Sequence, residues 1–309
     1  MSTDKRNRVA AIDCGTNSIR LLVSDIVGED KTDLVRDMRI VRLGQDVDKT
    51  GHLADEAIAR TLAATREFAA LITTLGVDSV RFCATSAARD ADNAEEFSEA
   101  IEGIIGVRPV VLTGEEEAQA SFLGAAGDLP VARTLVVDIG GGSTELIVGT
   151  GDDVEWSVSL DIGSVRMTER YLKSNPPTVA EASDCIAHLD TVLDKVLAEI
   201  APIDTFVGVA GTVTTVAAHT LNLASYDSDA IHHAELKLGD VSRACISLAR
   251  MRVADRRALP FMHPGRADVI GGGALILDRL IERLPLRTEI LLVSERDILD
   301  GIAWSIADQ

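Results

Sequence analysis

The sequence predicts an α/β protein built from two duplicated domains. At 309 residues the chain is long enough for about two domains, each with its own hydrophobic core. Segments with strand and helix patterns alternate in both halves, which is typical of α/β folds. One short motif occurs once in each half and marks the duplication. We expect domain I to cover residues 1–125 and domain II to cover residues 126–294.

The repeated motif predicts two β-hairpins with related turns. The first copy covers residues 11–23 as AIDCGTNSIRLLV, and the second covers residues 136–148 as VVDIGGGSTELIV. In each copy an apolar strand leads into small polar residues and glycine, and a second apolar strand returns. Backbone N–H groups in such turns can bind phosphate oxygens. We therefore interpret both copies as phosphate-binding hairpins.

The turns and the strand ends beside them supply the candidate binding residues. The turn residues are Gly15, Thr16, Asn17 and Ser18 in the first copy, and Gly140, Gly141, Gly142 and Ser143 in the second. Asp13 and Asp138 end the preceding strands, where a carboxylate can hold magnesium. Each carboxylate could instead accept a hydrogen bond from its own loop, as in an Asx-turn. The glycines of the second copy are equally explained by a plain tight hairpin.

The two copies differ two residues beyond the shared serine. The first copy has Arg20 there, and the second has Glu145. We expect both side chains to project into one cleft from opposite sides, where arginine would bind phosphate and glutamate would bind metal or water. The alternative is an ordinary solvent-facing position on a strand.

Between the hairpins the pattern predicts helices at residues 53–75 and 94–105 and strands at residues 80–85 and 107–112. The first of these helices stops at Gly76, a typical helix C-cap. Thr113 and Glu116 have the spacing of a capping box, so a helix should begin there. Acidic residues 115–117 also suit a first helical turn, because the helix dipole stabilises negative charge there. Arg89 follows a strand and a loop and could reach an anion, or could be an isolated surface arginine.

After the second hairpin the sequence predicts a helix from a second capping box, Thr178 with Glu181, to about residue 200. A strand at residues 206–209 leads into Gly211 and Thr212, whose N–H groups could hold a further phosphate or a nucleotide. Packing of a helix on a strand through small residues explains this segment equally well. Residues 290–293 predict a strand, and Ser294 is expected to cap a last helix that reaches residue 304.

Composition excludes several classes of protein. A net charge of −19 with no run of Lys or Arg argues against binding to DNA. No apolar run approaches the roughly 18 residues needed to span a membrane, and the N-terminus lacks a secretory pattern, so we expect a cytoplasmic protein. The four cysteines are widely spaced, which disfavours disulfides and zinc sites. P-loop, zincin and serine-hydrolase motifs are absent.

Together these motifs resemble the exopolyphosphatase/guanosine pentaphosphate phosphohydrolase family, a branch of the sugar kinase/Hsp70/actin superfamily. Besides the hairpins, the resemblance rests on residues 51–53, 84–91, 114–118, 208–212, 266–270 and 293–294, and it extends from about residue 8 to residue 304. It implies two ribonuclease H-like (actin-like ATPase) domains with an interdomain cleft, in the short two-domain form of the family. It also implies that a C-terminal helix, at about residues 295–309, packs back on domain I.

By this resemblance Glu117 would be the general base that deprotonates the attacking water, while Glu116 caps the helix. Asp138 and Glu145 would hold a catalytic magnesium ion, to which our reading of the turns adds Asp13. Arg89 and Arg20 would bind the terminal phosphates, and the hairpin turns the remaining oxygens. The resemblance allows Mn²⁺ as a substitute and K⁺ as an activator.

The implied activity is hydrolysis of a phosphoric anhydride, releasing orthophosphate from the ends of inorganic polyphosphate, particularly short chains. One alternative is a guanosine pentaphosphate 5′-phosphohydrolase. Others are a non-catalytic sensor that binds polyphosphate or the alarmone (p)ppGpp, and a sugar or acetate kinase. A homodimer without DNA or membrane partners is also expected.

Overall fold

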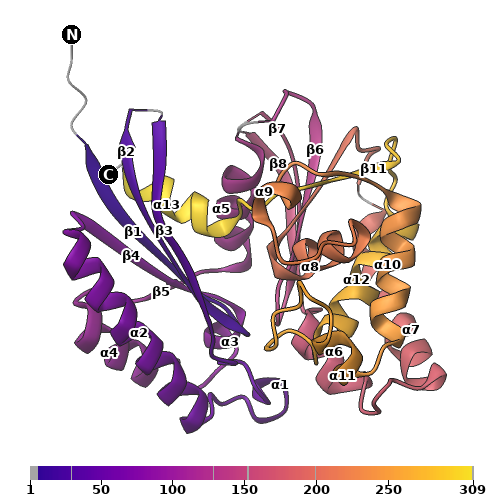
Figure 1. Cartoon of the computed structure of the whole chain (residues 1–309), viewed down its shortest axis with the longest axis horizontal. Coiled ribbons are helices and arrows are strands. Elements are labelled where there is room, and N and C mark those ends of the chain that lie inside the picture. Colours follow the sequence, from indigo (N-terminus) through magenta and orange to yellow (C-terminus); the bar gives the residue numbers. More distant parts are fainter. Residues whose placement is uncertain (1–5, 29, 128, 152, 199, 308–309) are drawn as a thin grey trace. The chain divides into compact units, whose positions relative to one another are not determined.

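The computed structural model describes residues 6–307, except residues 29, 128, 152 and 199. The chain divides into two compact units: unit 1 is Met1–Gly124 with Ile298–Gln309, and unit 2 is Ala125–Asp297. Each unit contains its own β-sheet and its own buried apolar cluster (Figure 1). The predicted α/β class with a duplicated ribonuclease H-like sheet is confirmed.

The first sheet is built by unit 1. The elements up to the unit boundary, with the last helix of the chain, are β1 (Asn7–Cys14), β2 (Ser18–Val27), β3 (Asp30–Ile40), α1 (Val47–Thr50), α2 (Asp55–Leu75), β4 (Ser79–Ala84), α3 (Ser86–Arg89), α4 (Ala94–Ile105), β5 (Val110–Val111), α5 (Gly114–Ala126) and α13 (Ile298–Ala307). The strands lie in the order β3-β2-β1-β4-β5. The first three pair antiparallel, and β4 and β5 extend the sheet in parallel.

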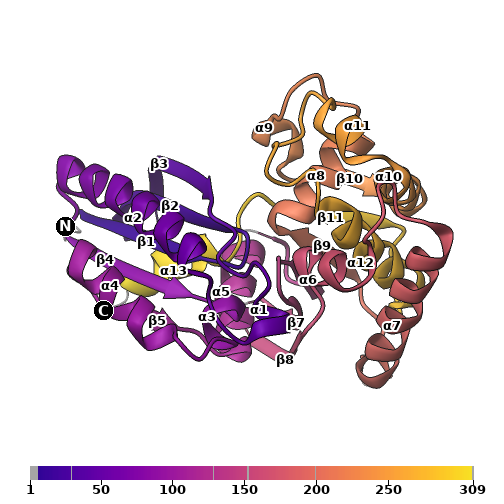
Figure 2. The same cartoon turned by 90° about the horizontal axis from the view of Figure 1, so that it is seen from below.

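Alternating side chains of β1 and β2 bury both faces of this sheet. Ile12 and Leu21 belong to a cluster with Phe68 of α2 and Phe97 of α4, so these two helices cover one face. Val9, Ala11 and Leu22 belong to a second cluster with Ile302 and other residues of α13, which covers the opposite face. Figures 1 and 2 show α2 and α4 side by side on their face of the sheet. The last helix of the chain is therefore an integral part of unit 1.

Unit 2 repeats this sheet. Its elements are β6 (Arg133–Ile139), β7 (Thr144–Thr150), β8 (Asp153–Leu160), α6 (Ser164–Tyr171), α7 (Val179–Leu197), β9 (Thr205–Val209), α8 (Ala210–Thr220), α9 (Ser228–Ile231), β10 (Glu235–Lys237), α10 (Leu238–Arg250), α11 (Val253–Arg257), α12 (Ile270–Arg283) and β11 (Ile290–Val293). The strand order is β10-β11-β9-β6-β7-β8. Strands β8, β7, β6, β9 and β11 take the places of β3, β2, β1, β4 and β5, with the same directions. Strand β10 is an addition at the edge, antiparallel to β11.

Most local signals in the sequence produced the expected elements. Gly76 ends α2 with a φ of 63°, and its N–H donates to Ile72 O and Thr73 O. The capping box of Thr178 and Glu181 is present in full, although α7 ends at Leu197 rather than near residue 200. Strand β5 is shorter than expected. Helix α5 continues to Ala126, one residue beyond the expected end of domain I.

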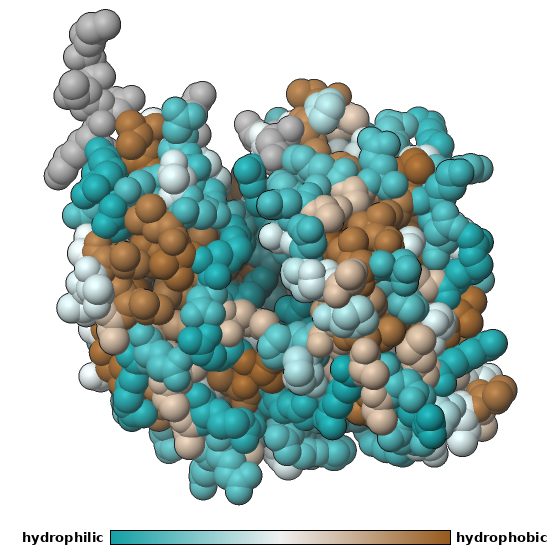
Figure 3. All heavy atoms as spheres, in the orientation of Figure 1, coloured by the Kyte–Doolittle hydropathy of each residue, from teal (hydrophilic) through white to brown (hydrophobic). Residues whose placement is uncertain are grey.

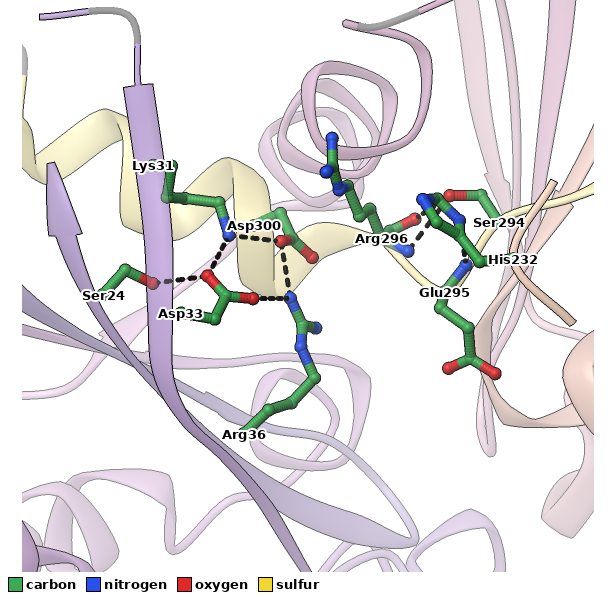
Figure 4. A network of polar contacts seen from close by, with 9 residues as sticks. All are labelled: Ser24, Lys31, Asp33, Arg36, His232, Ser294, Glu295, Arg296 and Asp300. Carbon is green, nitrogen blue, oxygen red and sulfur yellow. Dashed lines mark hydrogen bonds and ion pairs between the residues drawn. The ribbon is translucent and has the colours of Figure 1, made fainter. Parts of the chain in front are cut away.

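The prediction that Ser294 caps the last helix is wrong. Its hydroxyl accepts a hydrogen bond from Arg296 N (3.0 Å) and donates to Arg296 O (2.9 Å), so it closes a local turn (Figure 4). Helix α13 begins only at Ile298. A serine can bond its own backbone two residues on, and this turn competes with the capping role.

The four cysteines are buried, and one face of the molecule is mostly hydrophilic. All four cysteines are free and buried, and burial raises the pKa of Cys83 and of Cys185 to about 12. Such thiols pack as small apolar side chains. Hydrophilic residues cover most of the face seen in Figure 3, where hydrophobic residues form separate groups. Among the described residues, no helix combines the length and the apolar character needed to cross a membrane.

A buried ion-pair network attaches α13 to unit 1. Asp300, 1% exposed, accepts hydrogen bonds from Lys31 Nζ (2.9 Å) and Arg36 Nη2 (2.6 Å), both on β3. Asp33 contacts the same two cations and accepts a hydrogen bond from Ser24 (Figure 4). Because Lys31 is only 7% exposed, removing the Asp300 carboxylate would leave this cation with the more exposed Asp33 and with little access to water.

We predict that Asp300→Asn lowers the free energy of unfolding by about 3 kcal/mol, because it breaks a buried ion pair from one side. Asp33→Asn is the matched control, since the Asp33 side chain is 36% exposed and should contribute about 1 kcal/mol or less. Urea unfolding of both variants measures the difference. Equal effects would show that burial of Asp300 does not determine how strongly α13 is held.

Candidate functional site

The two predicted hairpins have the same turn. Gly15 N–H donates to Ser18 O at 2.9 Å in the first hairpin, and Gly140 N–H donates to Ser143 O at 3.1 Å in the second. The flanking strands, β1 with β2 and β6 with β7, are paired in the same antiparallel register. Both copies of the motif therefore form the same type of hairpin, one in each unit.

This register decides which side chains meet. In an antiparallel pair, residues directly opposite each other lie with their side chains on the same face. Asp13 is opposite Arg20 in the first hairpin, and Asp138 is opposite Glu145 in the second. The difference noted between the two copies of the motif is thus a difference in the partner of the strand-end aspartate.

In the first hairpin the aspartate has a cationic partner. Arg20 donates from Nε (2.9 Å) and from Nη2 (2.6 Å) to Asp13 Oδ2. Asp13 is 4% exposed, and the arginine side chain is 19% exposed. A charge-assisted contact of this kind neutralises a buried carboxylate and fixes the guanidinium in place.

In the second hairpin two carboxylates lie opposite each other. Asp138 is 6% exposed and Glu145 is 1% exposed. Glu145 Oε1 also accepts a hydrogen bond from Ser159 Oγ on β8, at 2.7 Å. Like charges at directly opposed positions repel, and burial strengthens the repulsion. Two carboxylates on one face of the hairpin offer oxygen ligands to a divalent cation, so the pair fits a metal ion.

The donor set suits magnesium in particular. Within the described ranges, no group of three or more His, Cys, Asp or Glu side chains could hold a metal ion. Magnesium is commonly held by only one or two carboxylates together with substrate phosphates and water. Asp138 and Glu145 provide this kind of incomplete site beside a turn that can face phosphate.

Backbone hydrogen bonds hold the first turn from outside. The N–H groups of Val41 and Arg42 donate to Asn17 O (3.0 and 2.9 Å), and Gly44 N–H donates to Thr16 O (2.9 Å). The hydroxyls of Thr16 and Ser86 lie 2.9 Å apart and share a hydrogen bond. The turn is therefore shaped before any ligand binds.

The second turn is held in the corresponding way by the start of α6. Ser164 N–H donates to Gly140 O (2.9 Å), Val165 N–H to Gly141 O (2.9 Å), and Arg166 Nε to Gly142 O (2.8 Å). A Cβ on Gly163 would lie 2.3 Å from Gly141 O, so only glycine permits this approach. Our sequence analysis missed both supporting segments. The duplication could have identified them, because each segment directly follows the third strand of its sheet.

At the start of α5, two neighbouring glutamates make different contacts. Glu116 accepts from Thr113 N (2.8 Å) while its own N–H donates to the Thr113 hydroxyl (3.2 Å), which confirms the capping box. These hydrogen bonds hold the pKa of Glu116 below its usual value. Glu117 is 8% exposed and accepts from Arg89 Nη1 (3.1 Å), which also donates to Leu112 O (2.9 Å). The structure thus brings together two residues predicted to act at the same site.

Residues Gly211 and Thr212 lie in the first turn of α8, and their surroundings are closely packed. A Cβ on Gly211 would lie 2.4 Å from Cζ of Arg266, and Arg266 Nη1 donates to Gly211 O at 3.4 Å. Thr212 is 5% exposed and lies against Gly273 of α12. This supports the packing interpretation of the segment, and phosphate binding there stays a prediction.

Comparisons with known proteins agree with the resemblance. A model of the Ppx/GppA phosphatase family matches residues 22–309. A Mycobacterium tuberculosis protein named Exopolyphosphatase 2 is 47% identical, covering 97% of this chain and 98% of its own. A Vibrio atlanticus protein named guanosine-5′-triphosphate,3′-diphosphate pyrophosphatase is 30% identical, covering 97% of this chain and 59% of its own. The crystal structure of an exopolyphosphatase-like protein superposes with a TM-score of 0.93 at 42% identity, covering 97% of this chain and 98% of that one.

We predict that Gly163→Ala lowers the free energy of unfolding by about 1–3 kcal/mol, because the new methyl group meets the backbone of the second turn. Gly103→Ala, at an exposed position in the last turn of α4, is the control, since a Cβ there meets nothing within 4 Å. It should stabilise the protein by roughly 0.5–1 kcal/mol. Chemical unfolding of both variants tests this, and a neutral Gly163→Ala would mean that α6 does not fix the turn.

Proposed function

Because the chain belongs to the Ppx/GppA phosphatase family, we propose that it is an exopolyphosphatase. This enzyme would hydrolyse the terminal phosphoric anhydride of inorganic polyphosphate and release orthophosphate. The observation that carries the proposal is the buried carboxylate pair Asp138 and Glu145 beside a fixed turn of the phosphate-binding type. Similarity along nearly the full length of the Mycobacterium relative supports the choice of substrate.

Asp138 and Glu145 are the proposed magnesium ligands, and Mn²⁺ prefers similar oxygen donors. When bound, such a cation neutralises phosphate charge and orients the phosphoryl group. This role is important here because the protein has a net charge of −19 and would otherwise repel a polyanion. Turn N–H groups of both hairpins and the guanidinium of Arg20 would bind phosphate oxygens directly.

Glu117 is the proposed general base, which takes a proton from the attacking water. Arg89 holds its carboxylate by the 3.1 Å hydrogen bond from Nη1. A guanidinium has five N–H donors, so Arg89 can orient Glu117 and still donate to a phosphate oxygen. The leaving phosphate chain departs as an anion and needs little further proton transfer.

A second candidate substrate is guanosine pentaphosphate, supported by the similarity to the Vibrio protein. The chemistry at the terminal anhydride is the same for both substrates, and the groups described above would serve either.

The proposal includes a cytoplasmic location, which buried free thiols favour because they suit a reducing compartment. It also includes a homodimer, as the resemblance implies, and a preference for short chains.

We predict that Glu117→Gln lowers kcat on polyphosphate by about 10²–10⁴-fold with little change in binding, because the amide cannot accept the proton. Glu116→Gln is the matched control. It has the same chemistry one residue earlier, at the capping position, and should retain activity within about threefold, since glutamine also completes a capping box. Steady-state phosphate release measures both. Similar losses for the two variants would contradict the assignment of the base.

Removal of divalent cations is predicted to abolish phosphate release, and added Mg²⁺ should restore it, because the carboxylate pair cannot bind phosphate by itself. Phosphate release from short polyphosphate and from guanosine pentaphosphate, assayed in parallel with and without Mg²⁺, measures this. Faster turnover of polyphosphate is the expected result. Phosphate release from guanosine pentaphosphate but not from polyphosphate would favour the second candidate substrate. Phosphate release without a divalent cation would contradict the proposed role of Asp138 and Glu145.

A further inference from the structure

We propose that Ser86 is a positioning residue for the proposed reaction. Its hydroxyl joins α3 to the turn of the first hairpin and so fixes Arg89 against Glu117. The inference rests on the proposed function for the roles of Arg89 and Glu117. It goes beyond that function because it assigns a task to a serine that takes no part in the proposed chemistry.

The hydrogen bond of Ser86 connects segments that are distant in the sequence. Ser86 is the first residue of α3, and its hydroxyl lies 2.9 Å from the hydroxyl of Thr16, 70 residues earlier. Both residues are buried, Ser86 with 3% and Thr16 with 7% of its surface exposed. Serine at the start of a helix commonly bonds the local backbone. Here the hydroxyl instead attaches the helix to the first hairpin.

Helix α3 is short and depends on such contacts. It covers only Ser86–Arg89, and isolated helices of this length are not stable in water. The side chain of Thr85, at the N-cap, makes no capping hydrogen bond. Thr85 N–H donates to Cys14 O (3.2 Å), and the hydroxyl pair adds a second connection to the same hairpin. The hairpin therefore fixes where α3 begins.

Close packing restricts the same junction. A Cβ on Gly44 would lie 2.2 Å from Thr16 Cγ2 and 3.2 Å from Ala87 Cβ, so the loop after β3 fits against both the turn and α3. Gly44 N–H also donates to Thr16 O, at 2.9 Å. The turn, the loop and the start of α3 thus form one packed cluster, in which a small shift of α3 disturbs several contacts.

The other end of α3 carries the functional group. Arg89 is its last residue, and Arg89 Nη1 donates to Leu112 O (2.9 Å) and to Glu117 Oε2 (3.1 Å). Asp90 N–H donates to Ser86 O (3.0 Å) and closes the single turn, so a shift at Ser86 moves Arg89 as well. Because a displacement of about 1 Å can lower the rate of an enzyme about 10²-fold, loss of the serine hydroxyl should slow the chemical step.

The test is a double-mutant cycle between Ser86 and Arg89, measured by steady-state phosphate release from short polyphosphate. Ser86→Ala should lower kcat about tenfold and change KM by less than about threefold, because the proposed base is displaced. In an Arg89→Gln background the same substitution should lower kcat by less than about twofold, since Ser86 acts through Arg89. A serine with a purely structural role would lower kcat by the same factor in both backgrounds.

Ser98→Ala is the matched control. Ser98 of α4 is also buried, with 5% of its surface exposed, but its hydroxyl donates within its own helix, to Ala94 O at 2.8 Å. This variant should retain kcat within about twofold. Circular dichroism confirms that each variant is folded. If Ser86→Ala does not fold, Thr16→Val removes the other hydroxyl of the pair and should show the same dependence on Arg89.

Crystal structures of Ser86→Ala and Ser98→Ala give a readout that requires no turnover. The distance between Arg89 Nη1 and Glu117 Oε2 should exceed hydrogen-bond range in the first variant and stay near 3.1 Å in the second. Three results would overturn the inference: equal losses of kcat in both backgrounds, wild-type kcat in folded Ser86→Ala, or an unchanged contact in its crystal structure. A wild type that releases phosphate from neither substrate would refute the proposed function, and the crystal structures would still decide whether Ser86 positions Arg89.

Discussion

Cross-strand register in the two hairpins is the constraint on which the candidate site depends. Antiparallel pairing brings Asp13 to Arg20 and Asp138 to Glu145, and no freedom remains to exchange these partners without turning side chains to the other face of the sheet. The strands on both sides of each turn are buried, which makes such a slip costly. One change of residue type at one position of a fixed frame therefore converts a neutral pair into a pair of carboxylates.

The rest of each unit keeps this frame rigid. The segment after the third strand donates backbone hydrogen bonds to the turn carbonyls, from residues 41–44 in unit 1 and 164–165 in unit 2. Helix α13 covers the second face of the first sheet and is held by Asp300 against Lys31 and Arg36. Functional groups held on a preorganised frame lose little entropy when a ligand binds, and this favours tight positioning of a charged substrate.

Local signals were sufficient to predict most of the fold. The repeated apolar and turn pattern predicted both hairpins, Gly76 predicted the end of α2, and Thr178 with Glu181 predicted the start of α7. Each of these features depends on residues close together in the sequence. Besides shifts in the ends of some elements, the local signal failed at Ser294. A local serine turn competes there with helix capping, and pattern alone does not distinguish the two.

Contacts between distant residues could not be predicted in this way. The pairing of Arg89 with Glu117 joins two residues that are 28 positions apart, and Asp300 contacts Lys31 from the opposite end of the chain. Ser159 was not identified either, because its role follows from its place opposite Glu145 in the sheet. The resemblance supplied the expected roles of Glu117 and Arg89, whereas only the folded chain shows that Arg89 donates a hydrogen bond to Glu117.

The most direct test of this account is anomalous diffraction from crystals of the wild type grown with Mn²⁺ and orthophosphate. The account predicts a manganese peak in each chain, coordinated by the carboxylates of Asp138 and Glu145. Manganese bound elsewhere, with neither of these carboxylates in contact with it, would contradict the account.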